Sequence, residues 1–229
     1  YNELGMLVSE SLTDLSDNPV NGIISDGTNG TSVINAHEVR YEYDSNGNNT
    51  AISIWNSGGQ AGTAADGTHV SRFTFDQRGR KTSEINLTAA GSPIKSSATD
   101  EPEVRYKYDN RNNTIEVAIF DGHGNPATGN SGFHRIAKEY DSHNRQVSEI
   151  YYDTAGNQVA AGNAQSSKCT VEYDERGNIT SMRYYAPDGK LRFENVRTYN
   201  EHNSVTSERI LNAPVSYTHL RAHETLANL

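Results

Sequence analysis

The segment Val104–Val159, VRYKYDNRNNTIEVAIFDGHGNPATGNSGFHRIAKEYDSHNRQVSEIYYDTAGNQV, contains two copies of one unit. Each copy has a Tyr-Asp pair, a short segment of alternating character, and then an Asp-x-x-Gly turn. The two Tyr-Asp pairs end at Asp109 and Asp141, and the two later turns begin at Asp121 and Asp153. This duplication predicts a fold made of small repeated units.

The same unit recurs along the chain when the Tyr-Asp pairs are aligned on their acidic or amide residue, which we call the anchor. The anchors are Asn2, Asp44, Asp76, Asp109, Asp141, Asp174 and Asn200. From Asp44 to Asp174, successive anchors lie 32, 33, 32 and 33 residues apart. A fixed period of this kind indicates a repeat architecture in which each unit packs against its neighbours.

Each unit carries two turns whose residue types suit a left-handed backbone. Three residues after the anchors stand Gly5, Gly47, Gly79, Asn112, Asn144, Gly177 and Asn203. A second turn begins twelve residues after each of the first six anchors, at Asp14, Asn56, Thr88, Asp121, Asp153 and Ala186, and its fourth residue is Asp17, Gly59, Gly91, Gly124, Gly156 or Gly189. Gly and Asn tolerate a positive φ, and an Asp or Asn side chain can accept a backbone hydrogen bond two residues on. We therefore predict tight turns at all these places.

The segments between the two turns are predicted to be strands. They hold about eight residues, too few for a stable helix, and the sixth residue after each anchor is β-branched: Val8, Thr50, Thr82, Ile115, Val147, Thr180 and Thr206. The predicted fold is all-β, an antiparallel meander of about a dozen short strands with tight turns on both edges. Insertions collect on one edge only, and the longest, residues 18–37, is expected to be a mobile surface loop.

Composition limits the core and the partners. Only 34% of the 229 residues are hydrophobic and the mean hydropathy is −0.77, so a thick core is not expected. Tyr occurs 13 times, and a tyrosine ring can cover a thin sheet while its hydroxyl still reaches water. The net charge of −9 argues against nucleic acid or an anionic membrane as a partner. No apolar run is long enough to predict membrane insertion of this segment, and no leader is recognised. Cys169 is the only cysteine, so neither a disulfide framework nor a thiolate metal site is expected.

Two regions are predicted along the chain. Residues 1–212 form the repeat domain, which we expect to be incomplete at both ends. Residues 213–229 include VSYTHLRAHET (215–225), which breaks the repeat and resembles translated sequencing-adaptor DNA. We expect this tail to be non-native and disordered, and the chain to be a piece of a metagenomic gene whose flanking domains lie elsewhere in the same protein.

The turn carboxylates are candidates for chemistry, but turn capping is the favoured interpretation. The residues predicted to be structural are Asp44, Gly47, Asp76, Gly79, Asp109, Asn112, Asp121, Gly124, Asp141, Asn144, Asp153, Gly156, Asp174 and Gly177. Each turn offers one carboxylate where calcium prefers six to eight oxygens, and nothing marks two of them as a glycosidase pair. The histidines before the tail are scattered, three of them in predicted turns. We predict no catalytic residue, no metal site and no cofactor.

Bulky aromatic residues recur just before the second turn: Trp55, Phe120, Tyr151, Tyr152, Tyr184 and Tyr185. They could form a ladder that stacks on sugar rings, or they could pack across strands as aromatic pairs do in sheets. A glycan array with Trp55→Ala and Tyr152→Ala would separate the two interpretations.

The sequences YEYDSNGN (from Tyr41), EYDSHNR (from Glu139) and VEYDERGNIT (from Val171) resemble the Tyr-Asp repeats of the RHS and YD-repeat families. The resemblance covers residues 1–210. It implies a β-sheet that coils into a shell or rod on large secreted or surface bacterial proteins concerned with contact, adhesion or toxin packaging. The period of 32–33 residues is longer than the unit of about 20 residues typical of those families, which favours a flatter, surface-exposed sheet.

The hypothesis that follows is a non-enzymatic structural and interaction module of a bacterial surface or secreted protein, placed outside the cell or on its surface by the resemblance. The alternative is a carbohydrate-binding or cell-wall-binding aromatic repeat, and the partner is a protein or a glycan of unknown identity. A weaker hypothesis makes the chain an accessory region of an enzyme.

Overall fold

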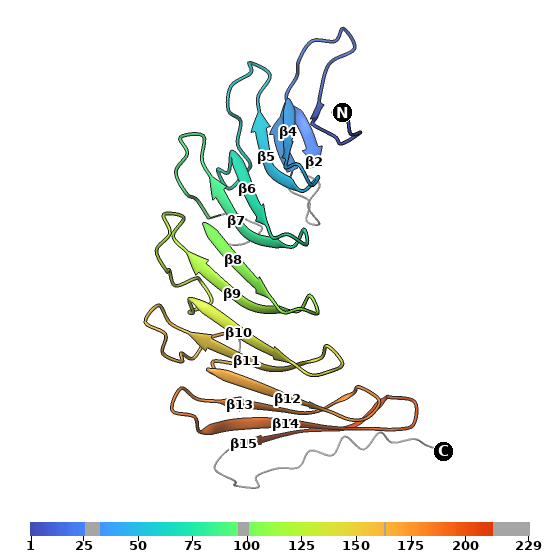
Figure 1. Ribbon diagram of the computed structural model, residues 1–229, viewed down its shortest axis with the longest axis vertical. Coiled ribbons are helices and arrows are strands. Elements are labelled where there is room, and N and C mark those ends of the chain that lie inside the picture. Colours follow the sequence, from blue (N-terminus) through green and yellow to red (C-terminus); the bar gives the residue numbers. More distant parts are fainter. Residues whose placement is uncertain (26–32, 96–100, 163, 213–229) are drawn as a thin grey trace, which may run out of the picture. The chain divides into compact units, whose positions relative to one another are not determined.

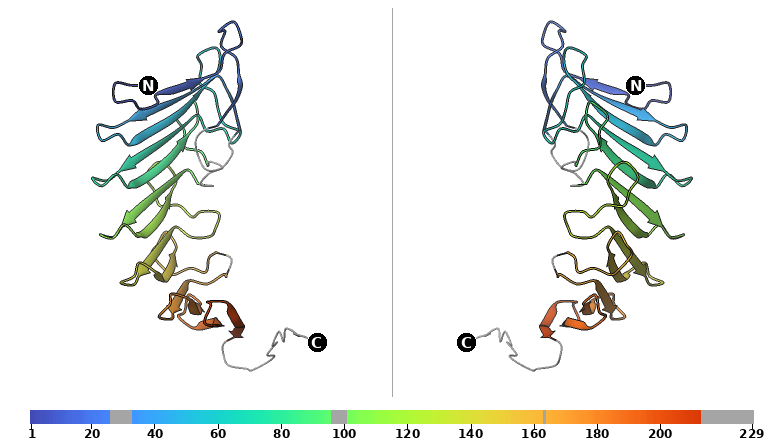
Figure 2. Two further views of the ribbon diagram at one scale, coloured as in Figure 1. Left: turned by 90° about the vertical axis from the view of Figure 1, so that its right-hand side faces the viewer. Right: turned by 90° about the vertical axis from the view of Figure 1, so that its left-hand side faces the viewer.

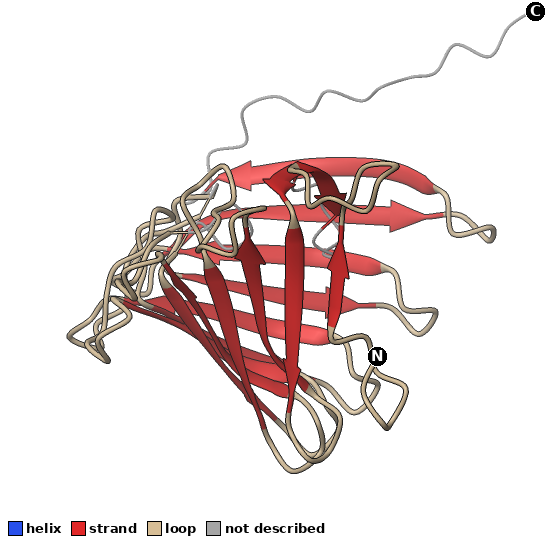
Figure 3. Ribbon diagram, turned by 90° about the horizontal axis from the view of Figure 1, so that it is seen from above, coloured by secondary structure: helices blue, strands red, loops and turns tan. Residues whose placement is uncertain are grey.

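The computed structural model describes residues 1–25, 33–95, 101–162 and 164–212. The described residues form strands, turns and loops, with no helix among them (Figure 3). The predicted tail, 213–229, lies outside the described residues. The predicted all-β antiparallel meander is confirmed: a sheet of 13 strands follows chain order as β1-β4-β5-β6-β7-β8-β9-β10-β11-β12-β13-β14-β15, and β2 and β3 pair separately (Figure 1).

The chain divides into two compact units. The first comprises Tyr1–Lys107 and Val117–Asn130. Its strands are β1 (Ser9–Ser11), β2 (Gly22–Ser25), β3 (Val33–Ala36), β4 (Glu38–Tyr43), β5 (Asn49–Trp55), β6 (Val70–Phe75) and β7 (Lys81–Leu87), with most of β8 (Glu103–Tyr108) and the end of β9 (Thr114–Phe120).

The second unit comprises Tyr108–Glu116 and Ser131–Leu229. Its strands are β10 (Arg135–Tyr140), β11 (Gln146–Tyr152), β12 (Lys168–Tyr173), β13 (Ile179–Tyr185), β14 (Leu191–Tyr199) and β15 (Val205–Asn212), with the start of β9. Within each unit the strands form successive antiparallel hairpins, visible from two sides in Figure 2.

The register within the hairpins is set by a bulge beside each first turn. In β4–β5, pairing runs from Glu38 with Trp55 to Glu42 with Ala51, and then shifts so that Tyr43 faces Asn49. The same shift occurs at the last residue of β6, β10, β12 and β14. A bulge increases the local twist and re-aims the side chain at that place, which is the Tyr or Phe that precedes the anchor.

The core is thin, as the composition predicts. In the first unit, Ala36, Val39 and Ile54 form a small buried cluster, and Leu12 and Ala64 from the edge loops pack on it. The insertion expected to be a loop holds β2 and β3 at its two ends, so that prediction was wrong for residues 22–25 and 33–36. Residues 26–32, the middle of that insertion, lie outside the described residues.

Candidate functional site

The first turns of the repeats are closed by the anchor side chain. In the Asp44 turn, Oδ1 accepts the N–H groups of Asn46 and Asn48, both at 2.9 Å, and Oδ2 accepts the side-chain amide of Asn48 at 2.9 Å. The same pair of N–H bonds is made to Asn2, Asp76, Asp109, Asp141, Asp174 and Asn200. Each carboxylate is therefore already occupied within its own turn.

A positive φ at the fourth residue completes these turns. Gly47, Gly79 and Gly177 have φ of 83°, 72° and 88°, and the non-glycine residues Asn112 and Asn144 have φ of 70° and 62°. The second turns at Asp121 and Asp153 have the same construction, with Gly124 at 94° and Gly156 at 86°. The predicted fourth residues of these turns thus share a positive φ.

The caps hold the turn carboxylates ionised. The pKa is lowered at Asp14, Asp44, Asp76, Asp121, Asp141, Asp153 and Asp174, and the largest cause in each is a hydrogen bond from the residue four positions later. At Asp141 that donor is the N–H of Arg145, and with help from the Arg145 side chain the pKa falls to about 2. Hydrogen bonds to the charged form act in this direction.

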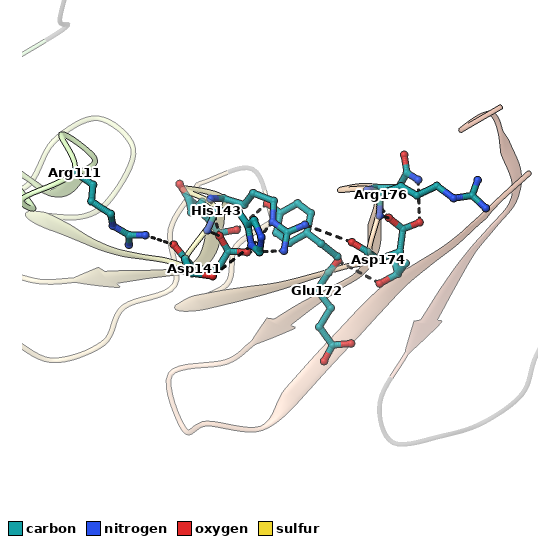
Figure 4. A network of polar contacts seen from close by, with 12 residues as sticks. Arg111, Asp141, His143, Glu172, Asp174 and Arg176 are labelled. Carbon is teal, nitrogen blue, oxygen red and sulfur yellow. Dashed lines mark hydrogen bonds and ion pairs between the residues drawn. The ribbon is translucent and has the colours of Figure 1, made fainter. Parts of the chain in front are cut away.

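Arginine side chains join successive turns in the second unit (Figure 4). Arg111 donates to the carbonyl oxygen of Asp141 at 2.6 Å, and Arg176 donates to that of Asn200 at 3.1 Å. Arg145 donates through Nε to Asp141 Oδ2 at 2.7 Å and through Nη1 to the Asp174 carbonyl at 3.4 Å. The polar groups at this edge therefore form a network along the repeats, with each link joining one turn to the next.

A Tyr before the anchor ties its hairpin to the preceding one in four repeats, a role that the sequence did not predict. The Tyr43 hydroxyl donates to the Leu7 carbonyl at 2.9 Å in the first unit. In the second unit, Tyr140, Tyr173 and Tyr199 donate to the carbonyls of Thr114, Gln146 and Ile179 at 3.0, 2.8 and 2.8 Å. In all four bonds the acceptor is the fifth residue after the preceding anchor, so the contact recurs at one place in the repeat.

We expect Tyr173→Phe to lower the free energy of unfolding by about 1 kcal/mol, the usual net contribution of one neutral hydrogen bond. The ring is retained in this variant, so its contact with Arg145, whose guanidinium carbon lies 4.5 Å from the ring centroid, is kept. Tyr173→Leu removes the ring as well and should cost more. Urea denaturation of the three proteins measures both steps, and an unchanged midpoint for Tyr173→Phe would contradict the role given to the hydroxyl.

The six predicted aromatic residues fall into two groups, because side chains alternate along a strand. Trp55, Phe120, Tyr152 and Tyr185 occupy the eleventh position after their anchors, and each ring has a cation from the partner strand over it. The distances to the ring centroid are 4.2 Å from Arg40, 3.7 Å from Arg105, 3.9 Å from Arg135 and 5.9 Å from Lys168. Cation–π contacts of this kind occupy one face of each ring.

Tyr151 and Tyr184 make up the other group and pack within the second unit. Tyr151 lies 5.2 Å from Phe133, centroid to centroid, and its hydroxyl bonds Glu149. Tyr184 stacks on Phe193 at 4.4 Å. Burial is the largest cause that raises the pKa of both tyrosines, and it raises the pKa of the neighbouring Cys169 thiol to about 11.

Three histidines that the sequence left as scattered, His37, His69 and His134, occupy the same repeat position, seven residues before an anchor, and the ring contacts of the first two show what that position does. His37 Nδ1 lies 2.7 Å from the Leu12 carbonyl oxygen, and His69 Nδ1 lies 2.9 Å from that of Gly62. Both rings fasten an edge loop to the sheet. The constant offset from Asp44 and Asp76 is the signal that could have identified this structural role.

Other kinds of site were sought in the part of the chain that the structure describes. No three His, Cys, Asp or Glu side chains there gather in a way that could hold a metal ion. No described helix could cross a membrane. An open hollow beside the Asp174 turn is lined in part by Arg176, Arg197 and Tyr199, and Arg197 is paired with Glu208 at 3.0 Å.

These features define a class of protein: a β-repeat protein with one antiparallel sheet of hairpins, in which Asp or Asn side chains cap the turns. No protein-family model matches the chain, and no curated protein matches it. Among solved structures, the chain is similar to the crystal structure of TcdB2-TccC3-TEV, with 13% identity, a TM-score of 0.49, and coverage of 89% of this chain and 10% of that one. The crystal structure of TcdB2-TccC3 gives 13% identity, a TM-score of 0.44, and coverage of 88% and 10%.

The structure of the Photorhabdus luminescens Tc holotoxin pore is also similar, with 13% identity, a TM-score of 0.38, and coverage of 77% of this chain and 9% of that one. The chain thus spans about a tenth of the length of the solved proteins that it resembles.

Proposed function

We propose that the chain is a non-enzymatic structural and interaction module, a repeat scaffold of a bacterial surface or secreted protein. The observation that carries the proposal is that the polar groups suited to chemistry make the same internal contact in one repeat after another. The anchor carboxylates close turns, and the tyrosine hydroxyls bind the preceding hairpin. A scaffold needs this uniformity, whereas an active site needs one place to differ from the rest.

Energetics support the same role. In a repeat protein, stability is the sum of unit stabilities and nearest-neighbour interfaces. Here each interface in the second unit contains a tyrosine hydroxyl bond and an arginine link at the turn edge, such as Tyr173 to Gln146 and Arg145 to Asp174. Such contacts are local to two neighbouring hairpins, so an extended sheet can be lengthened or shortened by whole units.

Removal of one whole period tests the proposal. Deleting residues 141–173, which join Tyr140 to Asp174, takes out 33 residues and leaves the repeat in register. We expect the shortened protein to keep the far-UV circular dichroism of a β-sheet and a cooperative urea transition. The matched control deletes residues 141–157, about half a period, which joins β10 directly to Gln158 and removes its hairpin partner.

The control deletion should lose the cooperative transition. If the 33-residue deletion behaves as the control does, the units are not interchangeable and the scaffold proposal fails. If it folds, every group in residues 141–173, including Tyr151, Tyr152 and Cys169, is dispensable for the architecture.

A further inference from the structure

The hollow beside the Asp174 turn brings two guanidinium groups and two threonine hydroxyls around one open space. Its volume is about 380 Å³, within the range of about 300–1,000 Å³ that small-molecule sites occupy. It lies inside the second unit, where it is lined by the turn itself, by Thr180 of β13 and by the last three residues of β14. The hollow is therefore large enough for a ligand of one or two sugar rings.

The residues around this hollow differ from those at the same positions of the preceding repeat. The positions are the sixth after the anchor and the third and second before the next anchor. They hold Thr180, Arg197 and Thr198 in the Asp174 repeat, against Val147, Val171 and Glu172 in the Asp141 repeat. Both repeats close the same turn and accept the same tyrosine bond from the next hairpin. The scaffold therefore does not require an arginine and two threonines at these positions.

Both guanidinium groups have N–H donors left for a ligand. Arg176 gives one N–H to the Asn200 carbonyl oxygen at 3.1 Å. Arg197 donates through Nε and Nη2 to Glu208 Oε1 at 3.1 and 3.0 Å, and 31% of its side chain is exposed. A guanidinium has five N–H donors, and their fixed geometry matches the two oxygens of a carboxylate. These two arginines are therefore suited to bind the carboxylate of a ligand.

The two acidic residues of the hollow differ in their effect on such an anion. Asp174 is committed to its own turn, where its Oδ1 accepts the N–H groups of Arg176 and Asn178 at 2.9 and 2.8 Å. Glu175 is exposed at the turn, so its carboxylate opposes a bound anion across water. Two guanidinium groups thus face one exposed carboxylate.

The threonine hydroxyls can accept hydrogen bonds from a ligand. Thr180 donates its hydroxyl hydrogen to the Glu172 carbonyl oxygen at 3.3 Å, and the hydroxyls of Thr198 and Thr206 bond each other at 2.9 Å. A hydroxyl that has made one bond keeps a lone pair that accepts another. A ligand that matches these oxygens must bring hydroxyl hydrogens of its own.

We propose that this hollow binds a sugar acid, with its carboxylate on Arg176 and Arg197 and its hydroxyl groups donating to Thr180 and Thr198. A sugar acid carries both kinds of group that the lining residues can bind. The net charge of −9 disfavours a long polyanion, so the ligand is a sugar acid of one or two residues. The proposal rests on the interaction role proposed above and gives that role a ligand class and a place.

The probe is glucuronic acid, titrated into the ¹⁵N-labelled full chain while the amide resonances are followed by NMR. Saturable shifts are expected at Arg176, Thr180 and Arg197. Glucose lacks the carboxylate and acetate lacks the hydroxyls. Each should bind at least about tenfold more weakly, because each loses one of the two sets of hydrogen bonds.

Three variants locate the site. Arg176→Gln should weaken glucuronic acid binding at least about fivefold, since it removes a charged donor. Arg111→Gln is the matched control, because Arg111 makes the same kind of link to the next turn but is not part of the hollow. It should leave the affinity unchanged. Glu175→Gln should tighten binding, because it removes the carboxylate that opposes the anion.

Circular dichroism verifies that the variants fold. Absence of saturable shifts up to about 100 mM glucuronic acid would overturn the proposal. Equal binding of glucose, or equal losses in Arg176→Gln and Arg111→Gln, would also overturn it, since the carboxylate would then not lie on the arginines of this hollow. The deletion of residues 141–173 leaves the lining residues in place and reports on the scaffold function separately.

Discussion

Gly122→Ala is expected to lower the free energy of unfolding by about 2–5 kcal/mol. Gly122 has φ of 81°, and a left-handed backbone costs an ordinary residue about 1–2 kcal/mol. A Cβ at this position would also overlap the Pro93 ring and approach Ile85 Cδ1 to 3.5 Å. Forcing extra atoms into a packed place typically adds about 1–3 kcal/mol.

Gly124→Ala is the matched control, two residues away in the same turn. Gly124 has φ of 94°, but nothing lies within 4 Å of a Cβ built there. We expect it to cost only the backbone contribution, about 1–2 kcal/mol. Urea denaturation of both variants measures the difference. Equal losses would show that Pro93 moves aside, and that the contact between this turn and the preceding edge loop is not tight.

Acid is expected to unfold the protein steeply below about pH 4. The turn aspartates of lowered pKa bind protons more readily when the chain is unfolded, where their pKa is near 3.9. Their contribution to stability is therefore complete above that value and is lost as the pH falls toward the folded values, about 2 for Asp141. The urea midpoint should fall continuously from pH 4.5 to pH 2.

Net charge acts in the opposite direction only above this range, between pH 7 and the isoelectric point. The chain carries −9 at pH 7, and protonation toward its isoelectric point of about 5.3 relieves self-repulsion. The window below pH 4 is therefore the informative one. A variant with Asp121→Asn and Asp153→Asn keeps both turns, because Asn2, Asn56 and Asn200 already cap turns in this chain. Its midpoint should fall less with acid, and an identical pH profile would contradict the role of these carboxylates.

The sequence predicted the strands and the turns because both depend on local properties. A period of 32–33 residues with Gly or Asn at fixed offsets implies one backbone conformation, and β-branched residues between turns imply strands. β9 and β11 occupy the segments 114–120 and 146–152 that the pattern predicts to be extended. Hairpins of this length leave little freedom for another arrangement.

Contacts between distant residues could not be predicted in this way. Tyr173 reaches the Gln146 carbonyl 27 residues earlier, and the pattern shows only that tyrosine recurs. The cations over the aromatic rings depend on cross-strand register, which the bulge beside each first turn sets. The pairing of Gly22–Ser25 with Val33–Ala36 was not predicted, because the polar residues of this insertion are typical of loops.

The aromatic positions show how far composition alone can mislead. Tyr151 and Tyr152 are adjacent in sequence, and a list of aromatic residues places them in one ladder. In the structure Tyr152 lies under Arg135, whereas Tyr151 packs beside Phe133. Whether the exposed parts of these rings bind sugar remains a prediction for the glycan array with Trp55→Ala and Tyr152→Ala.

The unequal spacing between second turns and following anchors has a practical consequence. Between Asp14 and Asp44 the chain accommodates an additional two-stranded pairing, yet the β4–β5 hairpin keeps the register of its neighbours. Foreign peptides grafted between a second turn and the next strand should therefore leave the register of the strands unchanged. The protein offers a natural display platform, on which several different epitopes could be presented in a row at intervals fixed by the period.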